Sequence, residues 1–201
     1  MSLALLAAFV AATAALMLIP GPNVALIVAN SLRYGAHGGL ITVAGTSAAM
    51  ALQLAVASLG VTALLGELGQ AFEVLRWLGV VYLVVLGARA WASPADDLSR
   101  MQAVSPGKTF ARGFLVSLTN PKTLAFYAAF LPQFLDPGAA LGRQMAILSV
   151  AFVATALVID GGWAVLAGRA RFVLGRFGRA RNRLTGGVLI GAAVGLALTR
   201  R

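Results

Sequence analysis

The fold of this chain is decided by its first 32 residues, MSLALLAAFVAATAALMLIPGPNVALIVANSL, which contain no charged side chain. Residues 34–66 form a second stretch without Asp, Glu, Lys or Arg. A helix needs about 20 apolar residues to cross the hydrocarbon of a bilayer. Each stretch therefore predicts one transmembrane helix, which we place at residues 3–31 and 40–66. The first has no basic start and is too long for a signal peptide, so we expect it to be retained.

The composition of the whole chain agrees with this interpretation. Of its 201 residues 60% are hydrophobic and 11% are charged, with a net charge of +10, whereas soluble domains are about 45–50% apolar and 25% charged. The basic residues stand in short clusters between apolar runs, which argues against a nucleic-acid partner. With no Cys and a single His, a disulfide framework, a zinc site and thiol chemistry are excluded. We expect an all-α integral membrane protein without metal or cofactor.

Four further apolar stretches predict helices at residues 74–92, 113–131, 144–168 and 184–199. A polar linker, residues 93–111, divides the six helices of this single domain into two halves of three. Because three is odd, the second half must enter the membrane from the side opposite to the first. The expected fold is therefore a 3+3 inverted repeat, a common transporter plan.

The basic residues predict the orientation in the membrane. Eleven of the sixteen Lys and Arg residues fall on one side of the six predicted helices, four fall on the other, and Lys122 lies within a helix. We expect the richer side to be cytoplasmic and both termini to be periplasmic. The arginine-rich loop at residues 169–183 either retains this topology or binds anionic lipid.

Helix-breaking and polar residues interrupt the first and fourth helices at matching positions. The first helix contains Pro20, Gly21, Pro22 and Asn23, and the fourth contains Asn120, Pro121 and Lys122. Proline frees a backbone carbonyl, which lipid cannot satisfy, so such breaks must face protein or a water-lined cavity. Broken helices at corresponding positions of two halves indicate a substrate site.

The fifth helix adds a carboxylate, Asp160, at the same depth. Asn23 is ten residues from Arg33, Lys122 is ten residues from Arg112, and Asp160 is nine residues from Arg169. At 1.5 Å per residue, all three lie about 13–15 Å from the cytoplasmic boundary. Charges in hydrocarbon are costly and usually functional. Alternatively, the Lys and the Asp only neutralise each other.

Weaker candidates line the same helices. Thr42, Thr46 and Gln53 share one face of the second helix, where they either line a pathway or bond to neighbouring helices. Thr123 and Tyr127 follow the break in the fourth helix and are further pathway candidates. Glycines 187, 191 and 195 form a smooth ridge for packing within the chain or between chains of a homo-oligomer.

These motifs resemble the LysE/RhtB family of amino-acid exporters. The similarity covers PGPN at residues 20–23, SLRYG at 31–35, LGVVYL at 78–83, and the segment from RGF at 112–114 through NPK at 120–122 to FLPQF at 130–134. Asp160 is similar to an acidic residue often seen in the fifth helix. The resemblance implies a proton-driven exporter of amino acids or related metabolites in the bacterial cytoplasmic membrane.

The chemistry of the site residues fits that class of substrate. Lys122 and the backbone donors of the first break can receive a carboxylate, Asp160 can receive an ammonium group or a proton, and the two asparagines can bind either end. Other readings remain open: an exporter of a metal ion or signalling metabolite, an intramembrane enzyme, or a membrane scaffold without transport. Against the enzyme, the chain's one imidazole, His37, falls in a predicted loop.

Overall fold

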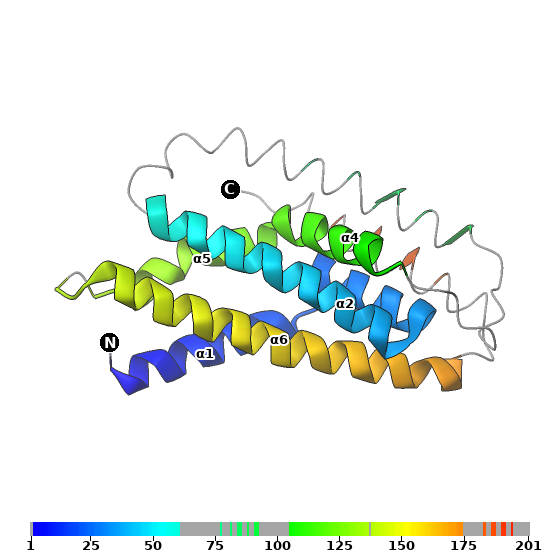
Figure 1. Ribbon diagram of the computed structural model, residues 1–201, viewed down its shortest axis with the longest axis horizontal. Coiled ribbons are helices and arrows are strands. Elements are labelled where there is room, and N and C mark those ends of the chain that lie inside the picture. Colours follow the sequence, from blue (N-terminus) through cyan, green and yellow to red (C-terminus); the bar gives the residue numbers. More distant parts are fainter. Residues whose placement is uncertain are drawn as a thin grey trace.

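The computed structural model describes residues 2–60, 105–136 and 138–174, together with thirteen separate residues between 77 and 92 and between 183 and 194. The regular structure of the described ranges is entirely helical. Its elements are α1 (Leu3–Leu18), α2 (Pro22–Gly60), α4 (Pro106–Leu118), α5 (Pro121–Ala129), the 3₁₀ helix η1 (Leu131–Phe134) and α6 (Leu141–Leu174) (Figure 1).

Most residues of the helices predicted at 74–92 and 184–199 lie outside the described residues. Of the thirteen separate described residues, twelve fall in these two stretches and Arg183 lies directly before the second; each of them is helical. The count of six helices therefore stays a prediction. The linker expected at residues 93–111 ends earlier than we predicted, because α4 begins at Pro106. Proline suits the first turn of a helix, where its missing N–H leaves no bond unmade.

The first predicted helix, residues 3–31, is in fact two helices. Ser2 caps α1, with its Oγ accepting from the Leu5 N–H at 3.2 Å. The helix ends at Leu18 because Ile19 is extended, with φ −71° and ψ 119°, as the residue before a proline tends to be. The chain re-enters a helix at Pro22. The break that the sequence predicts in this helix is therefore present.

The loop that we predicted between the first and second helices reduces to a turn at Gly35. This residue has φ 76° and ψ 179° within the otherwise helical span of α2, a conformation that a residue with a Cβ rarely adopts. The end of α6 packs on this turn. A Cβ at Gly35 would lie 2.8 Å from the Arg171 Nη1, and one at Gly168 would lie 2.6 Å from the Ala36 N.

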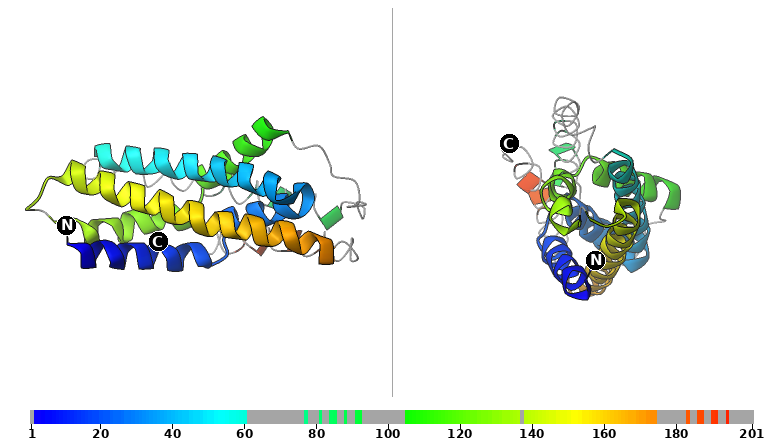
Figure 2. Two further views of the ribbon diagram at one scale, coloured as in Figure 1. Left: turned by 60° about the horizontal axis from the view of Figure 1, so that its bottom comes forward. Right: turned by 90° about the vertical axis from the view of Figure 1, so that its left-hand side faces the viewer.

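The helices lie alongside one another in a lengthwise bundle (Figure 2). α1 and α6 run in the same direction, and α4 and α5 run opposite to them. The turn of α2, the start of α4 and the end of α6 lie at one end of the bundle, with the N-terminus near the other. An aromatic cluster joins the helices near the N-terminal end. The Phe9 ring lies 5.1 Å from that of Phe134, 6.1 Å from that of Phe126 and 6.4 Å from that of Phe152.

Two of the described helical stretches, Pro22–Ser58 and Leu141–Arg171, are long and apolar enough to span a membrane. α6 is apolar on both faces. Val150, Val158 and Leu166 are 63–75% exposed, while Phe152 and Ala156 are buried. A helix between a protein core and water would carry polar residues on its outer face. An apolar outer face suits contact with lipid.

Glycines allow α2 and α4 to pack with their backbones in contact. A Cβ at Gly113 would lie 2.6 Å from the Thr42 carbonyl oxygen, and one at Gly45 would overlap the Phe110 carbonyl oxygen. The obstructing atoms belong to the backbone, so a side-chain rotation cannot relieve the overlap. Small residues serve this purpose between membrane helices in general.

We expect Gly45→Ala to destabilise the fold by about 1–3 kcal/mol, the usual range for overpacking, because the new methyl group must push α4 away from α2. Gly142→Ala is the matched control, since a Cβ at this exposed site meets no described atom within 4 Å. Thermal unfolding of the purified proteins in detergent measures both. Equal midpoints for the two variants would contradict the backbone contact.

Candidate functional site

The two helix breaks predicted from the sequence lie against each other. The Asn120 Nδ2 donates to the Asn23 Oδ1 at 2.8 Å, and the Asn23 Nδ2 donates to the Ser117 Oγ at 3.1 Å. All three side chains are buried. Residues almost 100 positions apart thus form one hydrogen-bonded chain between α2 and the junction of α4 and α5. The structure thus places the PGPN and NPK segments against each other.

Local sequence explains the second break. α4 ends at Leu118 and α5 begins at Pro121, with Asn120 extended between them. The Asn120 Oδ1 accepts from the Lys122 N–H at 3.0 Å, which satisfies one of the free donors at the start of α5. The Thr123 Oγ1 donates to the Asn120 carbonyl at 2.9 Å. This bond holds the Thr123 side chain in the first turn of α5, and its proposed role as a pathway residue stays a prediction.

The Lys122 ammonium bonds to the end of α1. Its Nζ donates to the carbonyl oxygens of Leu16 at 2.9 Å and of Ile19 at 2.8 Å. In an unbroken helix the Leu16 carbonyl would accept from residue 20, but Pro20 has no N–H. Lys122 thus satisfies the carbonyl that this proline frees.

Gly21 makes room for the lysine. A Cβ at Gly21 would lie 3.4 Å from the Cδ, the Cε and the Nζ of Lys122. The lysine stem therefore runs along the glycine in the gap between α1 and α2. Sequence reasoning placed Pro20, Gly21, Pro22 and Lys122 at one site, but it did not find the carbonyls, because backbone atoms carry no sequence signature.

Asp160 is completely buried, at 0% exposure, and neither carboxylate oxygen has a hydrogen-bond partner among the residues that the structure describes. The ring of Phe152 packs near that of Phe9, and α6 runs parallel to α1. Eight residues further along each helix, Asp160 is therefore level with Met17, at the end of α1. Its charge and that of Lys122 interact across the intervening space, but the lysine's hydrogen bonds go to the carbonyls.

The neighbours of Asp160 leave space. A Cβ at Gly161 or Gly162 would meet no described atom within 4 Å. Within the described ranges of the chain, the indole Nε1 of Trp163, one turn further along α6, has no hydrogen-bond partner. Sequence reasoning missed this tryptophan. The signal that could have found it is its position three residues after Asp160, on a neighbouring part of the helix surface.

The face of α2 proposed as a pathway is used for hydrogen bonds. The Asn30 Nδ2 donates to the Thr42 Oγ1 at 2.8 Å, and the Thr46 Oγ1 donates to the Val43 carbonyl at 3.0 Å. The Gln53 Nε2 donates to the carbonyls of Ser117 and Leu118 at 3.1 and 3.0 Å. The bonds of Thr42 and Gln53 support the alternative that this face bonds to neighbouring helical segments, whereas the bond of Thr46 lies within one turn of α2.

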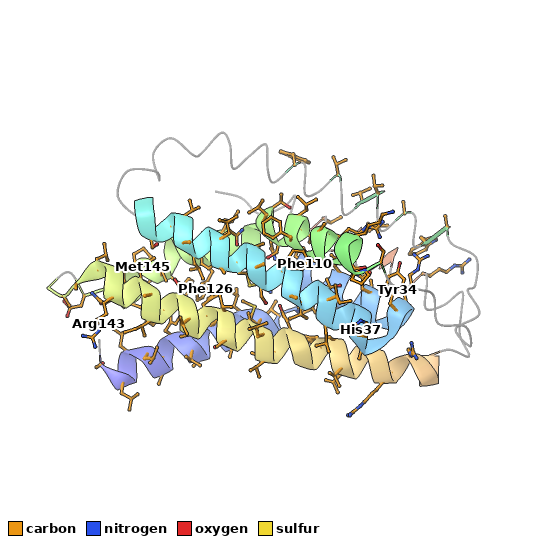
Figure 3. The ribbon with its side chains drawn as sticks, in the orientation of Figure 1. Tyr34, His37, Phe110, Phe126, Arg143 and Met145 are labelled. Atoms are coloured by element: carbon orange, nitrogen blue, oxygen red, sulfur yellow. The ribbon has the colours of Figure 1, made fainter. Side chains whose placement is uncertain are left out.

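Tyr127 belongs to the aromatic cluster near the N-terminal end of the bundle. Its ring meets that of Phe152 edge to face, with 5.0 Å between centroids, and its buried hydroxyl has no hydrogen-bond partner in the described part of the chain. Figure 3 shows Phe126 of this cluster well away from Tyr34 and His37, which lie at the end of the bundle that contains the α2 turn. Within the described part of the chain, no three His, Cys, Asp or Glu residues gather as a metal site would require.

The comparisons with known proteins are consistent with one another. Residues 14–200 match the family model for the LysE type translocator. The chain is 34% identical over 164 residues to a homoserine/homoserine lactone efflux protein of Salmonella typhimurium, covering 81% of this chain and 80% of that protein. It is 30% identical over 193 residues to a leucine efflux protein of Klebsiella pneumoniae, covering 90% of this chain and 89% of that protein. No solved structure matches.

We expect Asn120→Ala to destabilise the protein by about 1–2 kcal/mol through the lost helix cap, and further through the unpaired Asn23 oxygen. Asn120→Ser is the matched variant, since serine caps a helix about as well as asparagine but is too short to bridge to Asn23. Thermal unfolding in detergent compares the two. If the serine variant is as stable as the wild type, the bond between the breaks contributes nothing.

Proposed function

Because this chain belongs to the LysE type translocator family, we propose that it is a transporter that exports amino acids or closely related metabolites. Because the members of this family are translocators, the alternative of an intramembrane enzyme is excluded. The relatives named for efflux of leucine, homoserine and homoserine lactone support small amino compounds as substrates. All three compounds carry a primary amine.

The observation that carries this proposal is the contact between the two broken helices beside one positive and one negative side chain. A zwitterionic substrate needs both charges within one molecule's length. Lys122 lies at the contact between the breaks, and Asp160 lies level with the end of α1. In this proposal Lys122 attracts the carboxylate of the substrate, Asp160 attracts its ammonium group or a proton, and Asn23 and Asn120 orient it.

Asp160 also provides a means of coupling export to the proton gradient. A buried carboxylate with no hydrogen-bond partner is costly in hydrocarbon unless a cation or a proton reaches it. Lys122 stabilises its charge as long as that ammonium is nearby. A substrate carboxylate that takes over Lys122 removes this support, so that a proton binds Asp160 more readily. Substrate and proton then influence each other without direct contact.

The arrangement in the membrane follows from the same proposal. We place the chain in the bacterial cytoplasmic membrane as six helices in two inverted halves, with both termini periplasmic. The turn of α2, the start of α4 and the end of α6 share one end of the bundle, and Arg33, Lys108 and Arg171 belong to those segments. This shared end supports the basic side as cytoplasmic. The remaining partner is lipid, including anionic lipid at residues 169–183, and a homo-oligomer is compatible with the glycine ridge.

We expect inverted membrane vesicles containing this protein to accumulate labelled L-leucine or L-homoserine when a proton gradient is applied. Asp160→Asn keeps the shape of the side chain and removes its charge, so gradient-driven accumulation should be abolished while exchange without a gradient continues. Lys122→Gln should instead weaken substrate binding. Lys108→Gln, an exposed site on α4, is the control. Wild-type accumulation by Asp160→Asn would make the aspartate a structural residue only.

We expect a reporter fused after Arg201 to lie in the periplasm, because the eleven-to-four distribution of basic residues retains the richer side in the cytoplasm. Paired fusions of alkaline phosphatase, active in the periplasm, and green fluorescent protein, fluorescent in the cytoplasm, measure this. Fusions placed at residue 105, on the predicted cytoplasmic side, provide the opposite control. A fluorescent C-terminal fusion would contradict both the topology and the inverted repeat.

A further inference from the structure

The end of α1 has the chemistry of a binding site for a primary ammonium group. Two carbonyl oxygens, those of Leu16 and Ile19, converge on one Nζ at 2.9 and 2.8 Å. A helix C-terminus carries a partial negative charge, which favours a cation within the last turn. The group that binds there in the structure is the alkylammonium end of the Lys122 side chain.

The two carbonyls have no other way to be satisfied within their own helix. Pro20 has no N–H for the Leu16 carbonyl, and the helix is interrupted before Asn23, the residue that would otherwise donate to Ile19. Lipid cannot supply donors. An ammonium group supplies three, which is more than the pair requires.

A second observation at the same level points to a cationic ligand. Asp160 is fully buried, neither of its oxygens has a hydrogen-bond partner among the described residues, and it is level with the last turn of α1. Buried carboxylates are normally paired or hydrogen-bonded. The site therefore offers more acceptors than the lysine uses: two carbonyls that it occupies and two carboxylate oxygens that it leaves unbonded.

We propose that the carbonyls of Leu16 and Ile19 form the binding site for the ammonium group of the substrate, and that the Lys122 ammonium occupies this site while the transporter is empty. The inference rests on the proposed function and makes it more specific. An arriving amino acid replaces one ammonium group on the carbonyls by another. The displaced Lys122 then meets the substrate's carboxylate.

This exchange explains how a charged site can sit in hydrocarbon without a substrate. The empty site is neutralised by Lys122, so no carbonyl is left without a donor. A zwitterion brings both the ammonium group that replaces Lys122 and the carboxylate that receives it, so the exchange leaves no charge unpaired. A solute without charged groups can neither replace Lys122 on the carbonyls nor receive its ammonium group, which restricts this site to compounds with a primary amine.

Chemical rescue of Lys122→Ala tests the proposal without any transport assay. The substitution vacates the carbonyl pair, and propylammonium has the length and the charge of the missing side-chain end. We expect propylammonium chloride to raise the unfolding midpoint of the detergent-solubilised Lys122→Ala protein, with an apparent affinity about tenfold or more above that for the wild type. Lys108→Ala, which removes the other of the two lysines in the chain, is the matched control and should respond as the wild type does.

Three comparison solutes make the result specific to N–H donors. Tetramethylammonium has the charge but no donor, 1-propanol has a donor but no charge, and sodium is a small cation. The ammonium site would be overturned if tetramethylammonium or sodium stabilised Lys122→Ala as much as propylammonium does. It would also be overturned if the wild type, Lys122→Ala and Lys108→Ala responded equally to propylammonium.

If Lys122→Ala does not fold, the wild type answers the same question. Amine acetylation, quantified by mass spectrometry, gives the ratio of modification at Lys122 to that at Lys108. Propylammonium should raise this ratio by releasing Lys122, while tetramethylammonium should not; an unchanged ratio would reject the proposal. Rescue without amino-acid export would discard only the proposed function, and export without rescue would discard only this site.

Discussion

Polar side chains that reach the backbone carbonyls at the two helix breaks connect the helices of the described structure. Pro20 leaves the Leu16 carbonyl without its intrahelical donor, and Pro121 removes the donor four residues after Ser117, whose carbonyl still accepts from the Asn120 N–H at 3.0 Å. In hydrocarbon, no solvent can take the place of the lost donor. The Lys122 Nζ and the Gln53 Nε2, each from another helix, donate to these two carbonyls. Each break is thus stabilised by a long polar side chain that reaches it from elsewhere in the fold.

These side-chain bonds to the carbonyls make the two helix breaks depend on each other. Lys122 begins at the second break and ends at the first, and the bond between Asn120 and Asn23 runs beside it. A movement of α5 must therefore exchange or lose the bonds that satisfy α1. Tight backbone contacts of α2 with α4 at Gly113, and with α6 at Gly168, leave little freedom around the breaks, so the polar side chains at the centre are the parts that can change partners.

The sequence determined those features that follow from local rules. Long apolar runs predict membrane helices, prolines end helices at or before the preceding residue, and asparagine before proline predicts a capped restart; α1, α2, α4 and α5 follow these rules. The errors are also local. Gly35 turns the chain within a single residue where we expected a loop, and Pro106 starts α4 inside the expected linker, because glycine and proline also allow such sharp transitions.

Only the tertiary structure decided which partner each polar residue takes. From equal depth, Lys122 was expected to act with Asp160, yet its hydrogen bonds go to backbone carbonyls more than 100 residues earlier in the chain. Gln53 was a pathway candidate and instead donates to the end of α4. Depth and helical face can be read from spacing along one helix. The choice among several acceptors at one depth depends on the distances between helices, which packing sets and the sequence does not state.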